Sequence, residues 1–534
     1  MFAEWVYFTT RKLAQRAIFS IYFPPSCILY TIRLMNRACP SALRVLILAC
    51  WVLALSCQQK KTTVAWVIDL PVTGSQSSPR AQDLNGDGVL DIIMGAGRNE
   101  YQKSAQGILA FDGKSGNILW EQSAVDQVYG SATFYDVTAD GVADVFIGGR
   151  GPHFTALDGN NGHVIWEYKY AYDSDPILKF ARFNFNNSLL VPDQDGDGLM
   201  DLLTVNGGNA KADPSSEINR FPGVMMIMNS KTGAVIAADT MPDGRETYMS
   251  PILFKQPGQT DLTIIFGTGG ETLNGNLYQI ALADLKAQRL QNAKVLASEQ
   301  GHGFIAPASA ADINRDGYFD IVAISHGSTA FAIDGKTSAL LWKRSVGGTE
   351  SSNSLAVGNF NGDGIPDFFT FVSKGQWPNS TGSVQLMLDG SDGHIAFQDS
   401  IGCTGYSSPV VYDLNDDGVD EVLISVNEFD CSLGFAGKNP TTMENKLVSI
   451  DFKSGAVEVV DQLQGFKNIF STPWIGDLDS DGYLDIVECQ YYQRGMLLSF
   501  LGMRVKRIDT DIPMKKPVEW GAYMGTDGNG WYRK

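Results

Sequence analysis

The sequence predicts an all-β fold, an eight-bladed β-propeller whose blades are four-stranded antiparallel sheets. Three observations favour this fold. An acidic loop followed by a short apolar strand recurs along the chain, a glycine-containing hairpin recurs after it, and the repeats lack helical periodicity. Short strands at regular spacing, separated by such turns, are typical of propellers, in which each sequence repeat forms one blade. A seven-bladed ring is the alternative.

The acidic loop is clearest in the stretch from Asp83 to Asp91 (DLNGDGVLD). Oxygen-bearing side chains occupy positions 1, 3, 5 and 9 of this stretch, and Gly88 stands at position 6. The spacing directs these oxygens toward one hard cation, and the glycine permits the sharp turn that closes the loop. An EF-hand loop begins with the same spacing, but it requires a glutamate at position 12 and flanking helices. Here an apolar strand follows instead.

Copies of this loop indicate eight repeat units. The copies begin at Asp83, Asp136, Asp193, Asp312, Asn359, Asp413 and Asp477. The interval after Asp193 is about twice as long as the others. Apolar runs at 250–254 and 262–267 predict two strands of an additional unit there, and residues 255–261 replace its acidic loop. One predicted blade therefore lacks the loop.

A second repeat predicts the outer hairpin of each blade. It runs from Ala110 to Trp120, from Ala156 to Trp166 and from Ala332 to Trp342, with weaker copies at 387–397 and 449–459. Its Asp-Gly pair and the glycine that often follows supply the positive-φ positions of a tight hairpin. The terminal tryptophan offers a large flat surface for packing against a neighbouring unit, which is also how an ordinary core residue would behave.

The propeller is predicted to extend over residues 64–516 and to be closed by its N-terminal strand. Residues 64–70 (VAWVIDL) match the outermost strand of a unit, including its tryptophan. We expect them to complete the last blade, because this pairing removes an exposed sheet edge. The tail, residues 517–534, is expected to pack across the ring or to extend it.

The first part of the chain indicates an export signal, residues 1–56, that is removed. Its apolar stretch at 45–55 is too short to span a membrane and follows a basic region. A signal that starts at Met35 would be complete by itself, so Met35 is the expected true start. The end of the stretch resembles a bacterial lipoprotein signal, although Ala54 and Leu55 depart from its strictest form. The resemblance implies lipidation of Cys57.

The lipoprotein interpretation makes residues 57–63 a short tether. It predicts an exported protein of the bacterial cell envelope, an outer-membrane or surface lipoprotein that meets the membrane through its lipid anchor only. A plain secretory signal and a short anchor are the alternatives. Export also permits a disulfide. Cys403 precedes a predicted strand and Cys431 follows the next one, so a bridge between them and two buried thiols both remain open.

The formal net charge of −18 disfavours nucleic-acid binding, because phosphate recognition requires a basic surface. Much of the acid is clustered in the repeated loops. A cation bound in each loop would offset that charge locally.

The loops and the strands that follow them resemble the FG-GAP repeats of integrin α-subunit propellers and the related VCBS repeats of bacterial surface proteins. The hairpins resemble the blade signature of propellers of the pyrroloquinoline-quinone (PQQ) dehydrogenase type. Together the two resemblances cover about residues 64–510. In the FG-GAP family such loops bind calcium on one face of the propeller, and ligands meet other surfaces.

Carried over position by position, the resemblance implies calcium as the cofactor and a set of side-chain ligands in each loop. These ligands are Asp83, Asn85, Asp87 and Asp91; Asp136, Thr138, Asp140 and Asp144; Asp193, Asp195, Asp197 and Asp201; Asp312, Asn314, Asp316 and Asp320; Asn359, Asn361, Asp363 and Asp367; Asp413, Asn415, Asp417 and Glu421; and Asp477, Asp479, Asp481 and Asp485. An all-oxygen set suits calcium better than zinc or copper. The alternative is that these residues only form turns, but crowded carboxylates repel one another without a cation.

Two classes of function follow. The first is a binding, adhesion or scaffold module that meets a protein or glycan ligand at the cell surface. The second is an enzyme on the same scaffold, either polysaccharide lyase-like or quinoprotein-like. The sequence contains no recognised nucleophile or metalloprotease motif, so no catalytic residue is assigned. Candidates for a ligand site, in the central channel or on the face opposite the loops, are Arg80, Arg150, His153, Tyr248, His302, His326 and Tyr406.

Overall fold

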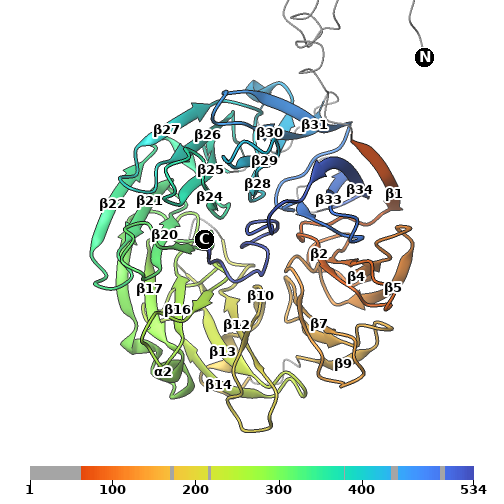
Figure 1. Ribbon diagram of the computed structural model, residues 1–534. Helices are drawn as coiled ribbons and strands as arrows, with labels where there is room; N and C mark the ends of the chain where they lie inside the picture. Colours follow the sequence, from red (N-terminus) through yellow and green to blue (C-terminus); the bar gives the residue numbers. More distant parts are fainter. Residues whose placement is uncertain are drawn as a thin grey trace, which may run out of the picture. The chain divides into compact units, whose positions relative to one another are not determined.

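The structure, a computed structural model, describes residues 62–168, 173–213, 218–377, 379–433, 443–492 and 499–533. The predicted signal region, the start at Met35, the lipidation site Cys57 and most of the tether lie outside the described residues. The described residues form eight antiparallel sheets that follow one another around a central axis, which confirms the eight-bladed propeller (Figure 1).

The first four blades follow the repeat units in chain order. Blade one contains β2 (Arg80–Gln82), β3 (Asp91–Gly95), β4 (Ser104–Phe111) and β5 (Ile118–Ala124), and blade two contains β6 (Thr133–Tyr135), β7 (Asp144–Gly148), β8 (Phe154–Leu157) and β9 (Val164–Glu167). Blade three contains β10 (Phe183–Phe185), β11 (Leu189–Val191), β12 (Asp201–Gly207), β13 (Val224–Met228) and β14 (Val235–Thr240). Blade four contains β15 (Ile252–Phe254), β16 (Thr263–Gly267), β17 (Gly275–Ala281) and β18 (Lys294–Glu299).

The other four blades complete the ring. Blade five contains β19 (Ser309–Ala311), β20 (Asp320–Ile324), β21 (Thr329–Ile333) and β22 (Leu340–Ser345), and blade six contains β23 (Thr349–Glu350), β24 (Ala356–Gly358), β25 (Asp367–Lys374), β26 (Ser383–Leu388) and β27 (Ile395–Asp399). Blade seven contains β28 (Val410–Tyr412), β29 (Glu421–Glu428), β30 (Glu444–Ile450) and β31 (Val457–Gln464). Blade eight contains β32 (Trp474–Gly476), β33 (Tyr483–Tyr492), β34 (Gly502–Pro513) and the N-terminal β1 (Thr63–Pro71).

The strands of a blade differ in burial because of their distance from the axis. The second strands β3, β7 and β20 are buried along their whole length, since neighbouring blades cover both faces. The outermost strand β5 buries only Trp120 and Ala124. This difference in burial explains why the sequences of the second strands are continuous apolar runs, whereas those of the outer strands contain polar residues.

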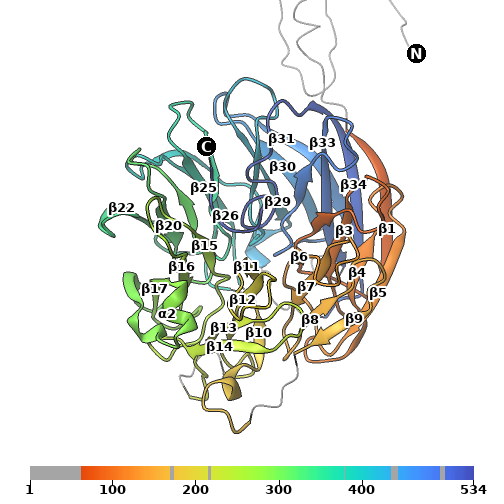
Figure 2. The same cartoon turned by 60° about the horizontal axis from the view of Figure 1, so that its bottom comes forward.

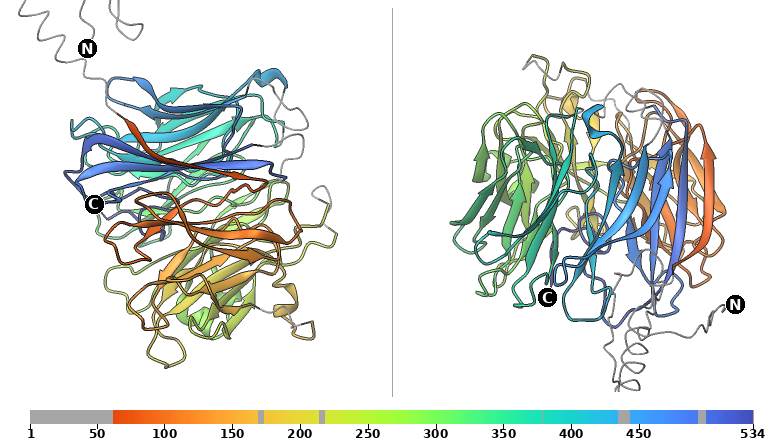
Figure 3. Two further views of the ribbon diagram at one scale, coloured as in Figure 1. Left: turned by 90° about the vertical axis from the view of Figure 1, so that its right-hand side faces the viewer. Right: turned by 90° about the horizontal axis from the view of Figure 1, so that it is seen from above.

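The ring closes as the sequence predicts. Strand β1 pairs antiparallel with β34, with Trp66 opposite Arg507 and Leu70 opposite Met503. Figure 3 shows this red strand beside the blue strands of the C-terminal blade. The pairing covers the outer edge of β34, which would otherwise be open to another chain.

Tryptophans join successive blades. Trp120 in blade one donates its Nε1–H to the carbonyl of Gly159 in blade two over 2.8 Å, and Trp342 in blade five does the same with Gly390 in blade six. Trp66 in β1 bonds Gly113 of blade one in the same way, so the last blade is joined to the first. The predicted packing of these tryptophans against a neighbour is confirmed.

The C-terminal tail crosses the centre of the ring (Figure 1). Its backbone bonds the innermost strands of blades seven and eight through Trp520 and Gly521, and that of blade five through Gly530 and Tyr532. Arg80 of blade one, which is buried, donates to the carbonyls of Tyr523 and Thr526 in the tail. Of the two predicted courses of the tail, it follows the one across the ring.

In the described part of the chain, helices are few and short. They are α2 (Leu282–Lys286), which follows β17 and also contacts β14 of blade three (Figure 2), and the 3₁₀ turns η1 (Leu178–Phe180), η2 (Leu290–Asn292) and η3 (Cys431–Leu433). Among the described residues, no helix is long and apolar enough to cross a membrane.

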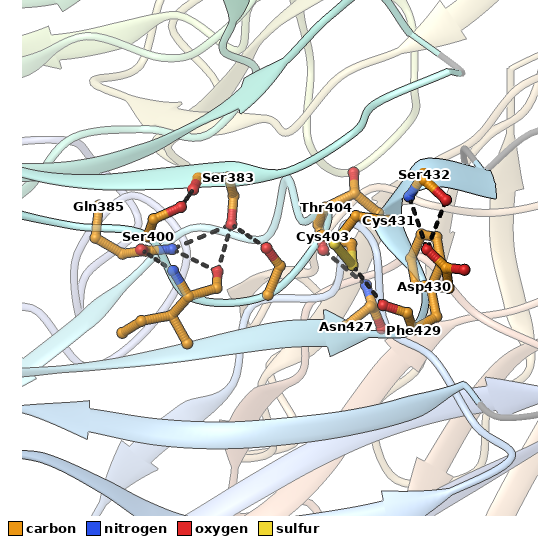
Figure 4. The surroundings of a disulfide bond; sticks show 12 residues. Ser383, Gln385, Ser400, Cys403, Thr404, Asn427, Phe429, Asp430, Cys431 and Ser432 are labelled. Atoms are coloured by element: carbon orange, nitrogen blue, oxygen red, sulfur yellow. Dashed lines mark hydrogen bonds between the residues drawn. A yellow bond between two sulfur atoms is a disulfide. The ribbon is translucent and has the colours of Figure 1, made fainter.

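A disulfide joins Cys403 and Cys431, the pairing that the sequence left open (Figure 4). Cys403 lies in the segment that enters blade seven, and Cys431 lies in η3 after the second strand of that blade. Thr404 forms an isolated bridge with Asn427 beside it. Cys489 is a free, buried cysteine.

Candidate functional site

The seven acidic loops share one backbone arrangement. In each loop the side chain at position 1 accepts the N–H of the glycine at position 6, over 2.8–3.2 Å. These glycines have φ values from 76° to 90°, a region that disfavours any residue with a Cβ. The loop shape is therefore specified locally by side-chain-to-backbone bonds and a glycine.

The carboxylate at position 9 differs from the others because it is buried. Asp91 Oδ2 accepts the N–H of Leu84 over 2.9 Å, and Oδ1 accepts the N–H of Gly113, in the outer hairpin of the same blade, over 3.0 Å. Asp320 and Gly335 form the same link in blade five. Burial raises the pKa of Asp91 and of Asp320 to about 6. Position 9 thus joins the loop to the hairpin.

Two of the loops bring three carboxylates close together. The carboxylate oxygens of Asp193, Asp195 and Asp197 lie within 4.8 Å of one another, as do those of Asp477, Asp479 and Asp485. Like charges this close destabilise a loop unless a cation lies between them. The donors are oxygens only and stand on a turn, which fits the ligand chemistry of calcium. The predicted ligand residues of all seven loops lie on these turns or, at position 9, in the following strand.

A cavity of about 520 Å³ lies on the axis at the other end of the blades. Its walls come from segments that precede first strands, such as Tyr129, Tyr248 and Tyr406, and from connections that follow second strands, such as Arg150 and His326. In an antiparallel blade these segments lie opposite the loop between the first and second strands. All eight blades contribute, and Tyr523 of the tail also lines the cavity.

Arg150 is the central cation of one wall. Its Nε lies 2.5 Å from Glu100 Oε1, and its Nη1 donates to Asn184 Oδ1 over 2.8 Å. The guanidinium also lies 5.2 Å from the ring centre of Tyr129, whose hydroxyl donates to the same Asn184 oxygen over 2.7 Å. Burial raises the pKa of Tyr129. The charge of Arg150 is therefore paired with Glu100, and its side chain also contacts Asn184 and Tyr129.

A second ion pair stands beside it. Arg220 Nη1 bonds Glu246 Oε1 and is half-buried, whereas the Glu246 side chain is fully buried. The other oxygen of Glu246, Oε2, has no hydrogen-bond partner in the described part of the chain. Burial raises the pKa of Tyr248, which lies in the field of Glu246, Arg220 and Arg150. The wall therefore presents a neutral phenol together with two paired guanidinium groups.

His326 and Glu350 form a third pair. His326 Nε2 lies 3.4 Å from Glu350 Oε2, and its Nδ1 lies 3.1 Å from the carbonyl of Ser351. The ring of His302 packs on His326, with ring centres 5.7 Å apart. Burial acts to raise the pKa of Glu350, but the hydrogen bonds from His326 and from the Trp377 N–H outweigh it, so this pKa is lowered.

Three aromatic side chains form the facing wall. Trp377, Tyr406 and Phe470 come from blades six, seven and eight. Ring centres lie 5.3 Å apart for Trp377 and Tyr406 and 5.7 Å apart for Tyr406 and Phe470, whose rings are stacked. Burial raises the pKa of Tyr406 to about 12. This wall offers apolar ring faces with one neutral hydroxyl.

The candidate residues from the sequence divide into three groups. Arg150, Tyr248, His326 and Tyr406 line the central cavity. His302 lies beside His326, and its Nδ1 lies 2.8 Å from the carbonyl of Glu271. Arg80 and His153 lie elsewhere: Arg80 is held by the tail, and His153 contacts Glu167 beside a separate cavity of about 160 Å³ between blades one and two.

Sequence reasoning missed several residues of the central cavity. Arg220, Glu271 and Trp377 lie in connections after second strands, each in a different blade. Glu271 directly follows a Gly-Gly pair, which marks a close backbone approach, but nothing in the local sequence indicates that its side chain reaches the axis. Their shared position, in the connection that follows a predicted second strand, is the sequence signal from which these residues could have been predicted.

Comparison with known families identifies both repeat types. The profile described as FG-GAP-like repeat matches residues 312–370, and the profile described as outer membrane protein assembly factor BamB matches residues 81–210. No curated protein sequence matches the chain.

Solved structures are similar to the chain at low sequence identity. The quinohemoprotein alcohol dehydrogenase ADHIIG from Pseudomonas putida HK5 is 10% identical with a TM-score of 0.50, and the match covers 84% of this chain and 76% of that one. BamB from Moraxella catarrhalis is 10% identical with a TM-score of 0.46, over 84% of this chain and 100% of that one. The rhamnogalacturonan lyase YesW is 15% identical with a TM-score of 0.37, over 87% and 77%.

These likenesses concern the fold, and the family profiles concern the repeats. The chain is an eight-bladed β-propeller that combines FG-GAP-like loops with PQQ-type blade hairpins.

Proposed function

We propose that the chain is an exported, calcium-binding propeller that binds a glycan in its central cavity and serves as a binding module at the bacterial cell envelope. One observation carries this proposal: the cavity is concave, polar on one wall and aromatic on the other, and built by all eight blades. Aromatic faces stack on sugar rings, and fixed polar groups orient their hydroxyls.

Calcium is the proposed ion of the acidic loops because they offer oxygen donors only, with three clustered carboxylates in the loop at Asp193. Its role would be structural, since the loops and the cavity lie at opposite ends of the blades. Metal analysis of the purified protein should find calcium, and chelator followed by dialysis should remove it. Absence of calcium in the protein as isolated from calcium-containing medium would contradict the proposal.

The envelope location rests on two supports. The lipoprotein-like sequence around Cys57 predicts an anchor, and the profile that matches residues 81–210 is described as an outer membrane protein assembly factor. Metabolic labelling with a fatty acid should modify the wild-type protein but not Cys57→Ser. Unlabelled wild-type protein would contradict the anchor while leaving the cavity proposal unaffected.

Glycan binding is tested with an array of neutral and charged oligosaccharides. Trp377→Ala should weaken binding of every glycan that the wild-type protein retains, because it removes the largest ring of the aromatic wall. Tyr483→Ala is the matched control, since this aromatic is exposed on the loop face. Equal binding by the wild type and Trp377→Ala would contradict a glycan site in the cavity.

An enzymatic function is the second candidate, favoured because Tyr248 lines the cavity together with Arg150 and Arg220. A lyase needs a base beside a group that neutralises an acidic sugar. However, both guanidinium groups are already paired with Glu100 and Glu246. Incubation with acidic polysaccharides should therefore give no unsaturated product, and its appearance in the ultraviolet spectrum, lost in Tyr248→Phe, would favour the enzyme instead.

A further inference from the structure

The charges of the central cavity do not balance. Of the carboxylates that line the cavity, those of Glu100 and Glu246 are each paired with an arginine. The remaining carboxylate is that of Glu271, which lines the cavity and is exposed to it. Burial raises the pKa of this carboxyl group, and the charges of His326, Glu350, Arg150 and Glu246 also act on it.

Glu271 lines the same cavity as the aromatic wall. Its charge acts on Tyr406, as does that of Glu350, and Glu350 in turn accepts the N–H of Trp377 over 2.6 Å. A carboxylate beside ring faces is the arrangement that binds an ammonium group, because the anion attracts the charge and the π-faces attract the cation. An acidic sugar would instead meet a surplus carboxylate.

We infer that the cavity selects a glycan that carries a free amino group, with the ammonium ion at Glu271 and the sugar face on Trp377. This inference rests on the proposed glycan binding and names the class of glycan. An amino sugar fits the cavity better than a basic peptide does, because three rings form a continuous wall that suits the flat face of a pyranose.

The test compares two oligosaccharides of one backbone by calorimetry with the purified protein: the β-1,4-linked glucosamine tetramer and its fully N-acetylated form. Acetylation removes the charge and leaves the rings. The wild-type protein should bind the amine form about tenfold more tightly, and Glu271→Gln should abolish this preference. Glu458→Gln, which changes an exposed glutamate in β31, is the matched control and should retain it.

Each other outcome has a defined meaning. Equal binding of both tetramers, or an unchanged preference in Glu271→Gln, would overturn the inference and leave glycan binding standing. Tighter binding of tetralysine than of the glucosamine tetramer would overturn the assignment to a sugar. If the array retains no glycan of either kind, the proposed function and this inference fall together.

A second inference concerns the loop at Asp477, and a different observation carries it. Arg507 of β34 is 4% exposed, and its Nη2 lies 2.5 Å from Asp479 and 3.2 Å from Asp485. Its Nε lies 2.9 Å from Asp509, and its Nη1 donates to the carbonyl of Gly113 over 3.3 Å. Two of the four expected calcium ligands of this loop are therefore bound to a side-chain cation.

The register of the blades explains why this loop is special. Ala110, Ala156 and Ala332 lie opposite the tryptophan of the outer strand in their blades, and Arg507 takes the equivalent place opposite Trp66. Arg507 donates to Oδ1 of Asp485, the position-9 carboxylate, whereas in blades one, two, five and six the same oxygen accepts the N–H of a hairpin glycine. This is also the seam at which the last blade meets the first.

We infer that the guanidinium of Arg507 replaces the metal ion in the Asp477 loop, so this blade closes the ring without calcium. The inference rests on calcium binding by the other loops. Native mass spectrometry should find one calcium fewer than the number of acidic loops. Arg507→Gln should bind one more calcium ion than the wild type. Arg504→Gln is the control on the same strand, β34: it breaks a pair with Asp69 of β1 and should bind no additional ion.

A second measurement does not depend on the folding of Arg507→Gln. Asp479→Asn should leave the number of bound calcium ions unchanged, and Asp195→Asn should lower it by one. Loss of one ion in Asp479→Asn would overturn the replacement. A protein without any bound calcium would overturn both the calcium proposal and this inference.

Discussion

At the scale of the residue, glycines and tryptophans decide how blades fit together. Gly393 of blade six has φ +71°, and a Cβ there would lie 2.5 Å from the ring of Trp342 in blade five. Gly116, Gly162 and Gly233 receive Trp66, Trp120 and Trp166 in the same way. The second glycine of the hairpin is therefore required for two reasons: the turn needs its positive φ, and the tryptophan ring of the neighbouring blade leaves no room for a Cβ.

Gly393→Ala separates these two requirements from each other. Gly455 has almost the same φ, +73°, but a Cβ added there would meet no atom within 4 Å. We expect Gly455→Ala to cost about 1–2 kcal/mol for the left-handed backbone, and Gly393→Ala to cost about 1–3 kcal/mol more because of overpacking against Trp342. Denaturant unfolding of both variants measures the difference, and equal losses would contradict the docking role of the tryptophan.

At the scale of the element, the closing strand and the disulfide each tie together parts of the last two blades. Strand β1 supplies the outer edge of blade eight, and the Cys403–Cys431 bond ties the entry of blade seven to the end of β29. The sequence separation of the two cysteines is 28 residues. A cross-link of this length restricts the unfolded chain far more than a local turn does.

Removal of the disulfide should lower the free energy of unfolding by roughly 3 kcal/mol, according to loop-closure entropy. The variant to measure is Cys403→Ser with Cys431→Ser. Its melting temperature should be insensitive to reductant, whereas that of the wild type should fall when a thiol is added. A wild-type melting temperature that reductant does not change would show that the bond is absent in solution.

At the scale of the whole molecule, the two ends of the ring carry different chemistry. The acidic loops gather negative charge at one end, and the cavity with its paired charges opens at the other. The tail forms part of the cavity floor through Tyr523 and bonds the inner strands of several blades. The acidic loops occur in seven blades and the tail bonds several blades, so removal of bound calcium or of the tail should lower the stability of the whole ring.

Chelation of calcium should destabilise the propeller. Each site that is filled at a hundredfold excess over its Kd contributes about 2.7 kcal/mol to the free energy of unfolding. The melting temperature should therefore fall on addition of excess chelator and recover with calcium, but not with magnesium at the same concentration. An unchanged melt would contradict occupied calcium loops.

Truncation of the tail after Pro517 should have a separate effect. It exposes the inner-strand groups that the tail covers and removes Trp520, Met524 and Tyr532 from the core, each worth about 1.5–3 kcal/mol of burial. We expect a large fall in melting temperature and loss of any ligand bound in the cavity. Arg533→Ala, at an exposed position of the tail, is the control and should change neither property.

The sequence by itself determined the blade plan. The acidic loops, the hairpins and the strand around Trp66 were all predicted correctly as elements, because each is specified by residues close together in the chain, through glycine conformation and side-chain-to-backbone bonds. It left the Cys403–Cys431 pairing and the course of the tail open, and only the tertiary structure chose between the alternatives.

The tertiary structure alone decided the composition of the cavity and the partner of Arg507. Glu271 and Trp377 come from connections in different blades, and nothing in their local sequence relates them. They meet because eight blades converge on one axis, so the position of each side chain depends on closure of the whole ring. Arg507 likewise reaches Asp479 only through the register of β33 and β34, a contact that periodicity along the chain does not encode.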